Sequence, residues 1–297
     1  MSAVLALDVG GTKLAGAVVL DDATVVVADR RPTAGSDGEA LFDVVVDLLS
    51  GVLDAAEAAG VDRSEISSLG VGCGGPMSAG GEDVSPLNIP QWRGFPLRSR
   101  LAEWSGLPTT VDNDAKALAL GEGWVGAASG VADFLAMVVS TGVGGGIVLG
   151  GRLLDGADGN AGHIGHVIVD PVGRPCVCGA IGCLEAQVSG AAIAAATGRP
   201  AAEATVSQRV TAGRLVGRAV ASVCNLLDLR LAVVAGSVAL GFGDVFFDAA
   251  NEELDRCARI DFARGALIVP SADGTRGPIV GAAAVGLRGI GRDVGIA

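Results

Sequence analysis

The sequence is short of positive charge. Its 297 residues include 21 lysines and arginines against 33 aspartates and glutamates, so the formal net charge at pH 7 is −12. Nucleic-acid phosphates and anionic membrane faces bind basic surfaces, and we expect neither as a partner of so acidic a chain. A nucleotide can still bind, because backbone N–H groups and a bound cation supply local positive potential.

Targeting signals and long apolar runs are also missing. The N-terminal segment MSAVLALDVGG has no basic residue and reaches Asp8 after a few apolar residues, unlike a signal peptide. No uncharged apolar run attains the roughly 20 residues of a membrane span. We therefore expect a cytoplasmic protein. Half of the residues are hydrophobic, which is enough for a large core, and the length favours two lobes.

Cysteine and histidine are scarce, with six and two residues respectively. Cys73, Cys224 and Cys257 are scattered along the chain, and we expect reduced core residues here rather than a disulfide framework.

The other cysteines gather near a histidine. His166, Cys176, Cys178 and Cys183 fall within eighteen residues, and three thiolates with one imidazole match a closed tetrahedral zinc site. The spacing lacks the paired CxxC knuckles of a generic zinc finger. The glycines that would let a short loop fold around one ion are Gly173, Gly179 and Gly182. The alternative is three buried, inert cysteines and a core histidine, which the clustering disfavours.

A glycine-rich turn follows the first apolar segment. Residues 4–8 read as a buried strand, 10–13 as a tight turn and 14–20 as a second strand, so the pattern predicts a hairpin. The Walker pattern GxxxxGK[ST] is absent.

This turn has groups suited to phosphate. Gly10 and Gly11 let the backbone approach a ligand closely, and Thr12 and Lys13 add further donors. Asp8, at the strand end, could hold Mg²⁺ directly or through water. An ordinary hairpin with a solvated aspartate is the alternative.

A second hairpin of the same kind is predicted half a chain later. Residues 135–139 read as a strand, 140–146 as a glycine turn containing Thr141 and Gly142, and 147–149 as the returning strand. Two such hairpins are what an internally duplicated ATPase fold would show. A clean GxGxxG fingerprint is absent, which argues against a Rossmann dinucleotide site.

A run of polar residues, Asp112, Asn113 and Asp114, lies between a strand at 109–111 and a helix at 115–121. Such residues usually cap the helix, and we expect one of the three to do so. The remaining predicted elements are helices at 38–60, 189–198, 207–229 and 277–289, strands at 69–73 and 232–234, and a loop at 80–90.

Together these motifs resemble the ROK family of sugar kinases and sugar-sensing repressors across essentially the whole chain. The most specific is GHxxxxxxxxxCxCGxxGCxE, carried by His166, Cys176, Cys178, Gly179, Gly182, Cys183 and Glu185. The resemblance implies an α/β, two-lobed actin-like and hexokinase-like ATPase fold (a duplicated ribonuclease-H-like fold) with a sugar and ATP cleft between the lobes. The implied lobes are 1–112, completed by a C-terminal helix at 282–297, and 113–281 with the zinc loop.

The same resemblance implies roles for individual residues. Asp114 would be the catalytic base, Zn²⁺ would be structural, Mg²⁺ would accompany ATP, and a homodimer is expected. The implied sugar-binding residues are Asn88, Asn113, His163, His166 and Glu185. The implied nucleotide-binding residues are Asp8, Gly10, Gly11, Thr12, Lys13, Thr141, Gly142 and Gly236. For Asn88, within PLNIPQW, the alternative is a plain surface loop.

Three features favour the kinase branch of this family. Its repressors carry an additional basic N-terminal domain, whereas this sequence begins at the first ATPase strand and is acidic. A non-enzymatic sugar-binding relative would be expected to have lost Asp114 or a glycine turn, and both are present.

The prediction of the sugar substrate depends on one departure from the family pattern. Most members read ExGH where this chain reads His163-Ile164-Gly165-His166. A carboxylate only accepts hydrogen bonds, whereas a neutral imidazole also donates, which suits the carbonyl of an N-acetyl group. AGHIGH, DVGGTKLA and VSTGVGGG look like bacterial N-acetylmannosamine kinases, while PLNIPQW looks like glucokinases. N-acetylmannosamine, phosphorylated at its 6-hydroxyl, is thus the first expectation and glucose the second. A related hexose or cyclitol, and polyphosphate as donor, stay open.

Overall fold

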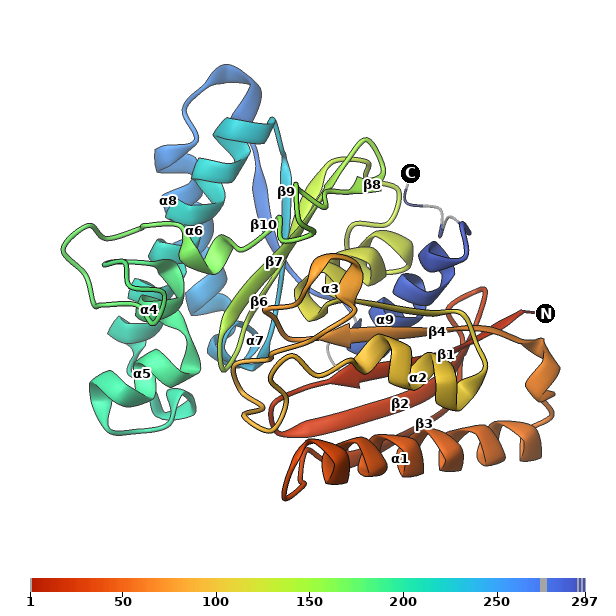
Figure 1. Ribbon diagram of the computed structural model, residues 1–297. Coiled ribbons are helices and arrows are strands. Elements are labelled where there is room, and N and C mark those ends of the chain that lie inside the picture. The colour runs from red at the N-terminus through yellow and green to blue at the C-terminus, as the bar shows by residue number, and fades with distance from the viewer. Residues whose placement is uncertain (1, 273–276, 293, 295, 297) are drawn as a thin grey trace. The chain divides into compact units, whose positions relative to one another are not determined.

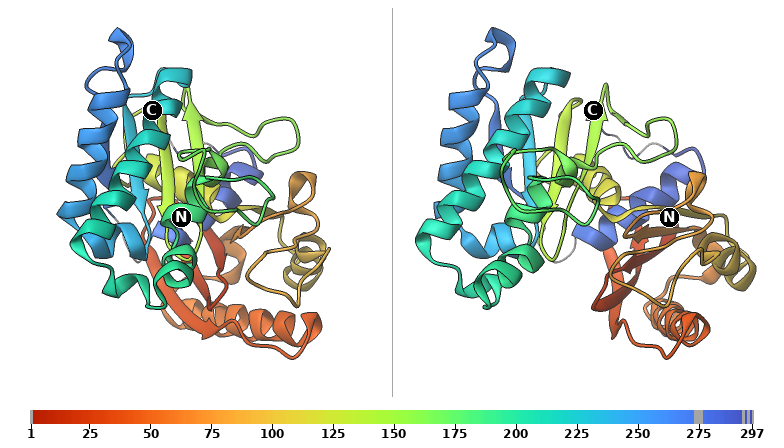
Figure 2. Two further views of the ribbon diagram at one scale, coloured as in Figure 1. Left: turned by 90° about the vertical axis from the view of Figure 1, so that its left-hand side faces the viewer. Right: turned by 60° about the vertical axis from the view of Figure 1, so that its left-hand side comes forward.

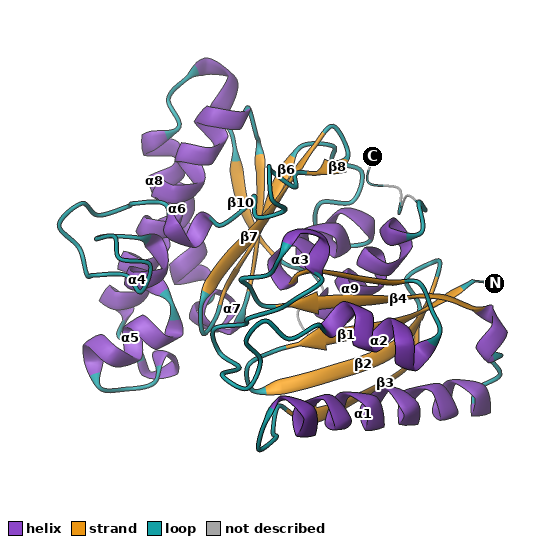
Figure 3. Ribbon diagram, in the orientation of Figure 1, coloured by secondary structure: helices purple, strands orange, loops and turns teal. Residues whose placement is uncertain are grey.

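The computed structural model describes residues 2–272, 277–292, 294 and 296, and the chain divides into two compact units, each built on a five-stranded sheet (Figures 1 and 3). The first comprises residues 2–125, 156–159 and the described residues from 277 to 296. The second comprises residues 126–155 and the described residues from 160 to 272.

The strands of the first unit are β1 (Ala3–Val9), β2 (Lys13–Leu20), β3 (Val25–Pro32), β4 (Ile66–Cys73) and β5 (Thr109–Asn113), in the order β3-β2-β1-β4-β5. Its helices are α1 (Gly38–Ala58), α2 (Leu97–Ser105), α3 (Asp114–Trp124) and α9 (Gly277–Gly289), with short 3₁₀ turns at Arg63–Glu65 and Ala79–Gly81.

Both faces of this first sheet are covered. Side chains alternate along a strand, so Leu5 and Leu7 of β1 join the core beneath α1, while Val4 and Ala6 pack with α9. Figure 1 shows α1 running along its face of the sheet. Helix α9 approaches β4 so closely that a Cβ on Gly70 would lie 2.0 Å from the carbonyl oxygen of Ala282. Glycine is therefore required at this contact.

The strands of the second unit are β6 (Phe134–Val139), β7 (Val143–Leu149), β8 (Arg152–Leu153), β9 (Leu231–Ala235) and β10 (Leu267–Pro270), in the order β10-β9-β6-β7-β8. Its helices are α4 (Leu184–Val188), α5 (Gly190–Thr197), α6 (Val206–Leu227), α7 (Ser237–Phe242) and α8 (Asp244–Cys257), with 3₁₀ turns at Ile164–His166, Ala201–Glu203 and Asp261–Ala263.

Helices α6 and α8 are the main cover of the second sheet and lie side by side (Figure 2). A Cβ on Gly213 would lie 2.3 Å from the Phe246 carbonyl oxygen, and one on Gly217 would lie 2.2 Å from that of Ala250. These two glycines of α6 thus let the helix backbones approach closely. The core beneath them is apolar and includes Leu135, Met137, Val216, Val220, Phe246 and Leu254.

The two sheets have the same plan. In each, an antiparallel hairpin (β1–β2 or β6–β7) is followed by two parallel strands (β4 and β5, or β9 and β10), and a third antiparallel strand closes the hairpin edge. The predicted duplication of an α/β ATPase fold is confirmed by this matching order and direction.

Some boundaries differ from the prediction. The first unit extends to Val125, past the predicted boundary at 112, because α3 packs against α9 and β4 of that unit. The helix predicted at 277–289 is confirmed as α9, whereas the range 282–297 given for the C-terminal helix of the first lobe extends past its end at Gly289. Residues 293, 295 and 297 lie outside the described residues. The elements that were not predicted are strands β3, β8 and β10 and helices α2, α4, α7 and α8. Among the described residues, no helix is both long and apolar enough to cross a membrane.

Candidate functional site

The β1–β2 turn is shaped by its own backbone and by Thr33. The Gly10 N–H donates to the Lys13 carbonyl at 3.0 Å. The Thr33 hydroxyl donates to the Gly10 carbonyl at 2.6 Å, and its N–H donates to the Thr12 carbonyl at 3.2 Å. Gly10 is half-buried, while Gly11, Thr12 and Lys13 are exposed. The expected phosphate turn is therefore an ordered turn with solvent-facing groups, and Thr33 was missed because it lies twenty residues away.

Asn88 lies directly on this turn. A Cβ added to Gly11 would be only 2.6 Å from the Cβ of Asn88. Real Cβ atoms do not approach so closely, so glycine at position 11 makes room for the 86–90 segment. Asn88 is exposed, and the fold thus places this expected sugar contact beside the expected phosphate turn.

Two carboxylates flank one glycine of β4 in the first unit. A Cβ on Gly72 would lie 3.8 Å from Oδ1 of Asp8 and 3.7 Å from Cα of Asp114, and one on Gly74 would lie 4.0 Å from Oδ2 of Asp114. Burial, and then the charge of Asp114, raise the pKa of Asp8 to about 7, although Lys13 and Arg30 oppose the shift. Burial of the Cys73 thiol, followed by the charges of Asp114 and Asp8, raises the pKa of Cys73.

The three polar residues that open α3 have separate roles. Asn113 is the cap: its side-chain oxygen accepts from the Ala115 N–H at 3.0 Å. Asp112 is buried and pairs with the Lys116 ammonium at 2.9 Å and the Arg288 guanidinium at 3.4 Å. Asp114 begins the helix, with Oδ1 held by the Ala115 N–H and Oδ2 directed towards Gly74. One of the three caps the helix, as expected, and Asp114 is left as the carboxylate next to Asp8.

In the second unit the glycine turn is shorter than predicted. Only Ser140–Gly142 form the turn, and residues 143–146 belong to β7. The prediction of a seven-residue turn was wrong because glycine here serves packing: a Cβ on Gly145 would lie 2.9 Å from the Gly162 carbonyl oxygen. The loop before His166 rests on this strand.

A cavity of about 370 Å³ opens beside that turn. Gly190 N–H donates to the Ser140 carbonyl at 2.7 Å, and the hydroxyls of Ser140 and Ser237 are 2.9 Å apart. The predicted nucleotide residue Thr141 lines the cavity; the other lining residues include Gly190, Ala191, Ala194, Ala201, Val238 and Phe242. These were missed, since small apolar residues carry no chemical signature in a sequence.

Gly236 precedes this cavity at the start of α7. Its φ of 102° is left-handed, and a Cβ there would lie 2.3 Å from the Val139 carbonyl oxygen. Only glycine fits both constraints. Gly142 faces Glu185, whose Oε2 would lie 2.9 Å from an added Cβ and accepts from the Val143 N–H at 2.8 Å. Glu185 is thereby fixed against the Ser140–Gly142 turn.

The four expected metal ligands converge. Ligand atoms of His166, Cys176, Cys178 and Cys183 all lie within 4.8 Å of one another. The Cys176 sulfur is 3.7 Å from Nδ1 of His166, and the sulfurs of Cys178 and Cys183 are 3.6 Å apart. Ligands about 2.0–2.3 Å from one tetrahedral Zn²⁺ are roughly 3.5–3.8 Å apart, so the residues fit the ion.

The thiols of this cluster differ in pKa. Burial and the neighbouring thiols raise the pKa of Cys183 to about 12, whereas a backbone hydrogen bond from Ala180 lowers that of Cys178. A coordinated Zn²⁺ would deprotonate all three thiols. Gly182, between two ligands, has a φ of 82°, and a Cβ there would overlap the Asp170 carbonyl oxygen at 1.7 Å. The tight turn of this loop therefore requires glycine.

His163 lies just before the short 3₁₀ turn that ends at His166. Both imidazoles are exposed, and their ring centroids are 6.1 Å apart. His166 faces the thiols through Nδ1, which leaves Nε2 for another partner. The structure thus brings His163 close to the metal-ligand cluster.

Proteins similar to this chain include several sugar kinases. The ROK family model matches residues 4–288. The chain is 38% identical, over 255 residues, to the N-acetylmannosamine kinase of Citrobacter koseri, covering 80% of this chain and 84% of that protein.

Solved structures agree in fold. A ROK hexokinase from Thermus thermophilus has a TM-score of 0.84 and 31% identity, covering 97% of this chain and 99% of that one. A ROK family glucokinase from Streptomyces griseus, solved in complex with glucose and AMPPNP, has a TM-score of 0.81 and 28% identity, covering 97% of this chain and all of its own. With a family model matched over nearly its whole length and a duplicated fold shared with these enzymes, the chain belongs to the ROK family.

Proposed function

We propose that this sugar kinase of the ROK family transfers the γ-phosphoryl group of ATP to the 6-hydroxyl of N-acetylmannosamine. The observation that carries the proposal is that Asp8, near the end of β1, and Asp114, at the start of α3, both lie beside Gly72 of β4, close enough for the charge of Asp114 to raise the pKa of Asp8. One carboxylate there can take a proton while the other can hold a cation.

Asp114 is the proposed general base. The sugar 6-hydroxyl oxygen forms the new bond to the γ-phosphorus, its proton passes to the Asp114 carboxylate, and the bond between γ-phosphorus and the bridging oxygen breaks to release ADP. The Oδ2 of Asp114 lies 4.0 Å from the point that a Cβ on Gly74 would occupy, so glycine adds no side chain at this end of the carboxylate.

Asp8 would hold the Mg²⁺ that accompanies ATP. A carboxylate is the ligand that Mg²⁺ prefers, and Mg²⁺ would neutralise phosphate charge. Burial raises the pKa of Asp8 to about 7 because it destabilises the ionised carboxylate. A bound cation would stabilise that ionised form. The cavity beside Ser140 and Ser237 has room for a nucleobase and ribose. The AMPPNP complex of the Streptomyces glucokinase supports ATP as donor.

For the metal, we propose one structural Zn²⁺ held by His166 and the three clustered cysteines. With Nδ1 of His166 directed at the thiols, Nε2–H is left as a donor to a sugar hydroxyl. Glu185, fixed by the Val143 N–H, offers its other carboxylate oxygen as an acceptor. The metal would orient these two groups, and it takes no part in the transfer itself.

The choice of sugar rests on His163. Its imidazole can donate to the carbonyl of an N-acetyl group, which a glutamate at this position cannot do. The 38% identity to an N-acetylmannosamine kinase supports the same substrate. Glucose is the second candidate, because PLNIPQW looks like glucokinases and the Streptomyces relative was solved with glucose.

The test is a coupled kinase assay over hexoses and N-acetylhexosamines with wild type, His163→Glu and His163→Gln. Wild type should prefer N-acetylmannosamine. His163→Glu should move relative kcat/KM towards glucose by a few-fold to roughly a hundredfold, since one lost hydrogen bond is worth about 0.5–1.5 kcal/mol and more if a buried group is left unpaired. His163→Gln keeps a donor and should keep the preference. If wild type phosphorylates glucose far better than N-acetylmannosamine, the proposal is wrong and the protein is a glucokinase.

A further inference from the structure

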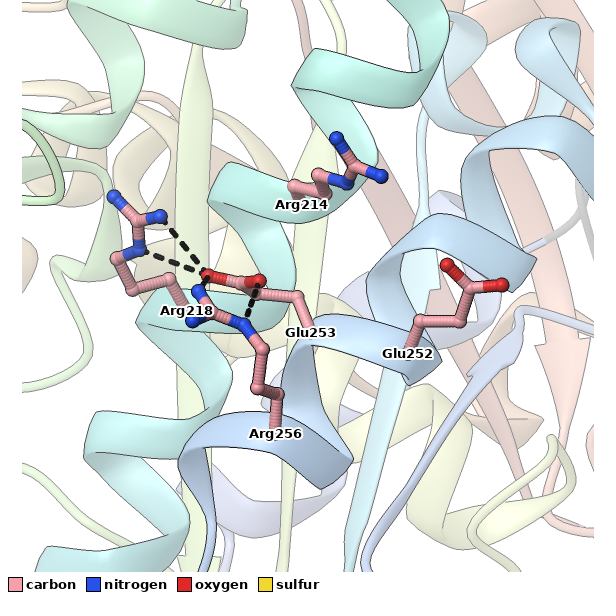
Figure 4. A pocket seen from close by; sticks show the side chains of 5 residues that line it. All are labelled: Arg214, Arg218, Glu252, Glu253 and Arg256. Carbon is pink, nitrogen blue, oxygen red and sulfur yellow. Dashed lines mark hydrogen bonds and ion pairs between the residues drawn. The ribbon is translucent and has the colours of Figure 1, made fainter.

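A buried carboxylate, that of Glu253, lies between helices α6 and α8. The side chain of Glu253 is only 5% exposed. Arg256 donates to it from the same helix at 2.6 and 2.8 Å, and Arg218 donates from α6 at 2.9 and 3.1 Å. Figure 4 shows both guanidinium groups directed at the Glu253 carboxylate. The hydrogen bond from Arg256, aided by Arg218, holds the pKa of Glu253 at about 2.

This cluster lines a surface cavity of about 360 Å³, yet it is not built to hold an anion. Glu253 already occupies the space between the two guanidinium groups. The third arginine, Arg214, and the second glutamate, Glu252, point away from it in Figure 4. In the described part of the chain neither has an ion pair or a side-chain hydrogen bond. The charges of Arg218 and Arg256 are thus already paired with Glu253.

Arg218 has a second contact that leads towards the metal ligands. Its other terminal nitrogen donates to the backbone carbonyl of Val169 at 2.8 Å. Val169 itself is buried, and its N–H donates to the Gly182 carbonyl at 2.9 Å. One guanidinium therefore joins the α6–α8 pair to the backbone of the loop.

The segment that Arg218 contacts connects two ligands. Ile168 is bridged to Cys183, and the Leu184 N–H donates to the Val167 carbonyl at 2.9 Å. His166 immediately precedes this pairing and Glu185 immediately follows it. A shift of Val169 would therefore move an imidazole ligand, a thiol ligand and the proposed sugar carboxylate together.

We propose that Arg218, oriented by Glu253 and Arg256, is a positioning residue that holds the 167–184 pairing in register for zinc and for the sugar. The inference rests on the proposed zinc site. Arginine suits this task because its rigid fork reaches two acceptors at once. Outer-shell partners of metal ligands change metal affinity by roughly 10–100-fold, which sets the expected size of the effect.

The experiment compares Arg218→Ala and Arg218→Lys with Arg214→Ala, a matched arginine one turn earlier in α6 that lacks both contacts. Zinc release from loaded protein is followed with a chromogenic chelator. Release should be about 10–100-fold faster in Arg218→Ala, smaller but measurable in Arg218→Lys, and unchanged in Arg214→Ala. The sugar KM should rise in the same order while the ATP KM stays constant.

A second measurement does not depend on the ion. Hydrogen exchange of the Val169 and Leu184 amides should accelerate in Arg218→Ala relative to Arg214→Ala, because their hydrogen bonds close the 167–184 pairing. Equal exchange and equal zinc release in the two alanine variants would overturn the proposal, as would a rise in ATP KM matching that of the sugar. Wild type without zinc would refute the metal site alone, while the exchange experiment would still decide the role of Arg218.

Discussion

At the scale of single residues, we propose different tasks for the two carboxylates of the first unit, and Asp114 is the one that α3 presents from its first turn. Asp114→Asn should lower kcat by about 10²–10⁴, because an amide cannot accept the proton of the sugar hydroxyl. Sugar and nucleotide binding should change little, since the replacement has the same shape. Steady-state kinetics and isothermal titration calorimetry measure the two quantities. Asp47→Asn, an exposed carboxylate on α1, is the control, and near-normal turnover in Asp114→Asn would contradict the assignment.

The raised pKa of Asp8 leads us to expect that the free energy of unfolding depends on pH. An ordinary aspartate, as in the unfolded chain, has a pKa of 3.8, whereas the folded chain holds the proton up to about pH 7. Between these values the folded state binds more protons than the unfolded state, so stability falls as pH rises, by up to about 1.4 kcal/mol per pH unit. This contribution is fully present below pH 3.8 and is lost as pH rises through 7.

Asp8→Asn removes this titration. In urea unfolding without Mg²⁺ or nucleotide, the free energy of unfolding of Asp8→Asn relative to wild type should increase from pH 5 to pH 7. Above pH 8 the difference should become constant. A difference that does not vary with pH over this interval would show that Asp8 titrates as an ordinary exposed aspartate.

At the scale of elements, the β1–β2 turn packs directly against the 86–90 segment. This contact is possible because position 11 is a glycine and has no Cβ. Gly11→Ala would bring two Cβ atoms to 2.6 Å, so the turn or Asn88 must move. Displacements of about 1 Å can cost roughly 10²-fold in rate, and we expect kcat/KM to fall by an amount up to that size. Gly51→Ala on α1 meets nothing within 4 Å and should leave activity unchanged while stabilising the helix by about 0.5–1 kcal/mol. Equal activity in the two variants would contradict the packing argument.

Elements with local signals were predictable and those defined by distant contacts were not. The β1–β2 hairpin and α1 follow from alternation and helical periodicity. Strand β3 was missed because it is an edge strand whose Asp29, Arg30 and Arg31 are more typical of a solvated segment. The glycines in the first half of β7 were predicted as part of a turn. The sequence did not show that Gly145 packs against the backbone of Gly162, because the two are well separated along the chain.

The candidate site shows the same division. Residues with distinctive chemistry, such as Asp114 and the four proposed metal ligands, could be singled out from spacing and resemblance, and their roles stay predictions. The cavity beside Ser140 could not, because it is made by alanines and glycines from α5, α7 and a 3₁₀ turn that only the fold brings together. Arg218 was equally hidden, since its acceptors lie 35 and 49 residues away in sequence.

At the scale of the whole molecule, the duplication gives two units with separate cores. The first buries its apolar side chains on both faces of its sheet, and the second packs α6, α8 and the loop residue Val169 into one cluster of its own. Because the four proposed metal ligands all belong to the second unit, zinc should stabilise that unit selectively. A ligand at a thousandfold excess over its Kd stabilises the folded state by about 4 kcal/mol.

Zinc removal therefore should not affect the two units equally. Elemental analysis of protein purified without chelator should find one zinc per chain, and chelation should then accelerate hydrogen exchange of the β6 amides while leaving those of β1 nearly unchanged. Cys178→Ser, at an exposed ligand, should reproduce the effect of the chelator, whereas Cys257→Ser, at a half-buried cysteine outside the cluster, should not. Uniform acceleration in both sheets would mean that the units unfold as one body, and protein without zinc would leave the four residues as a packed cluster of thiols beside a histidine.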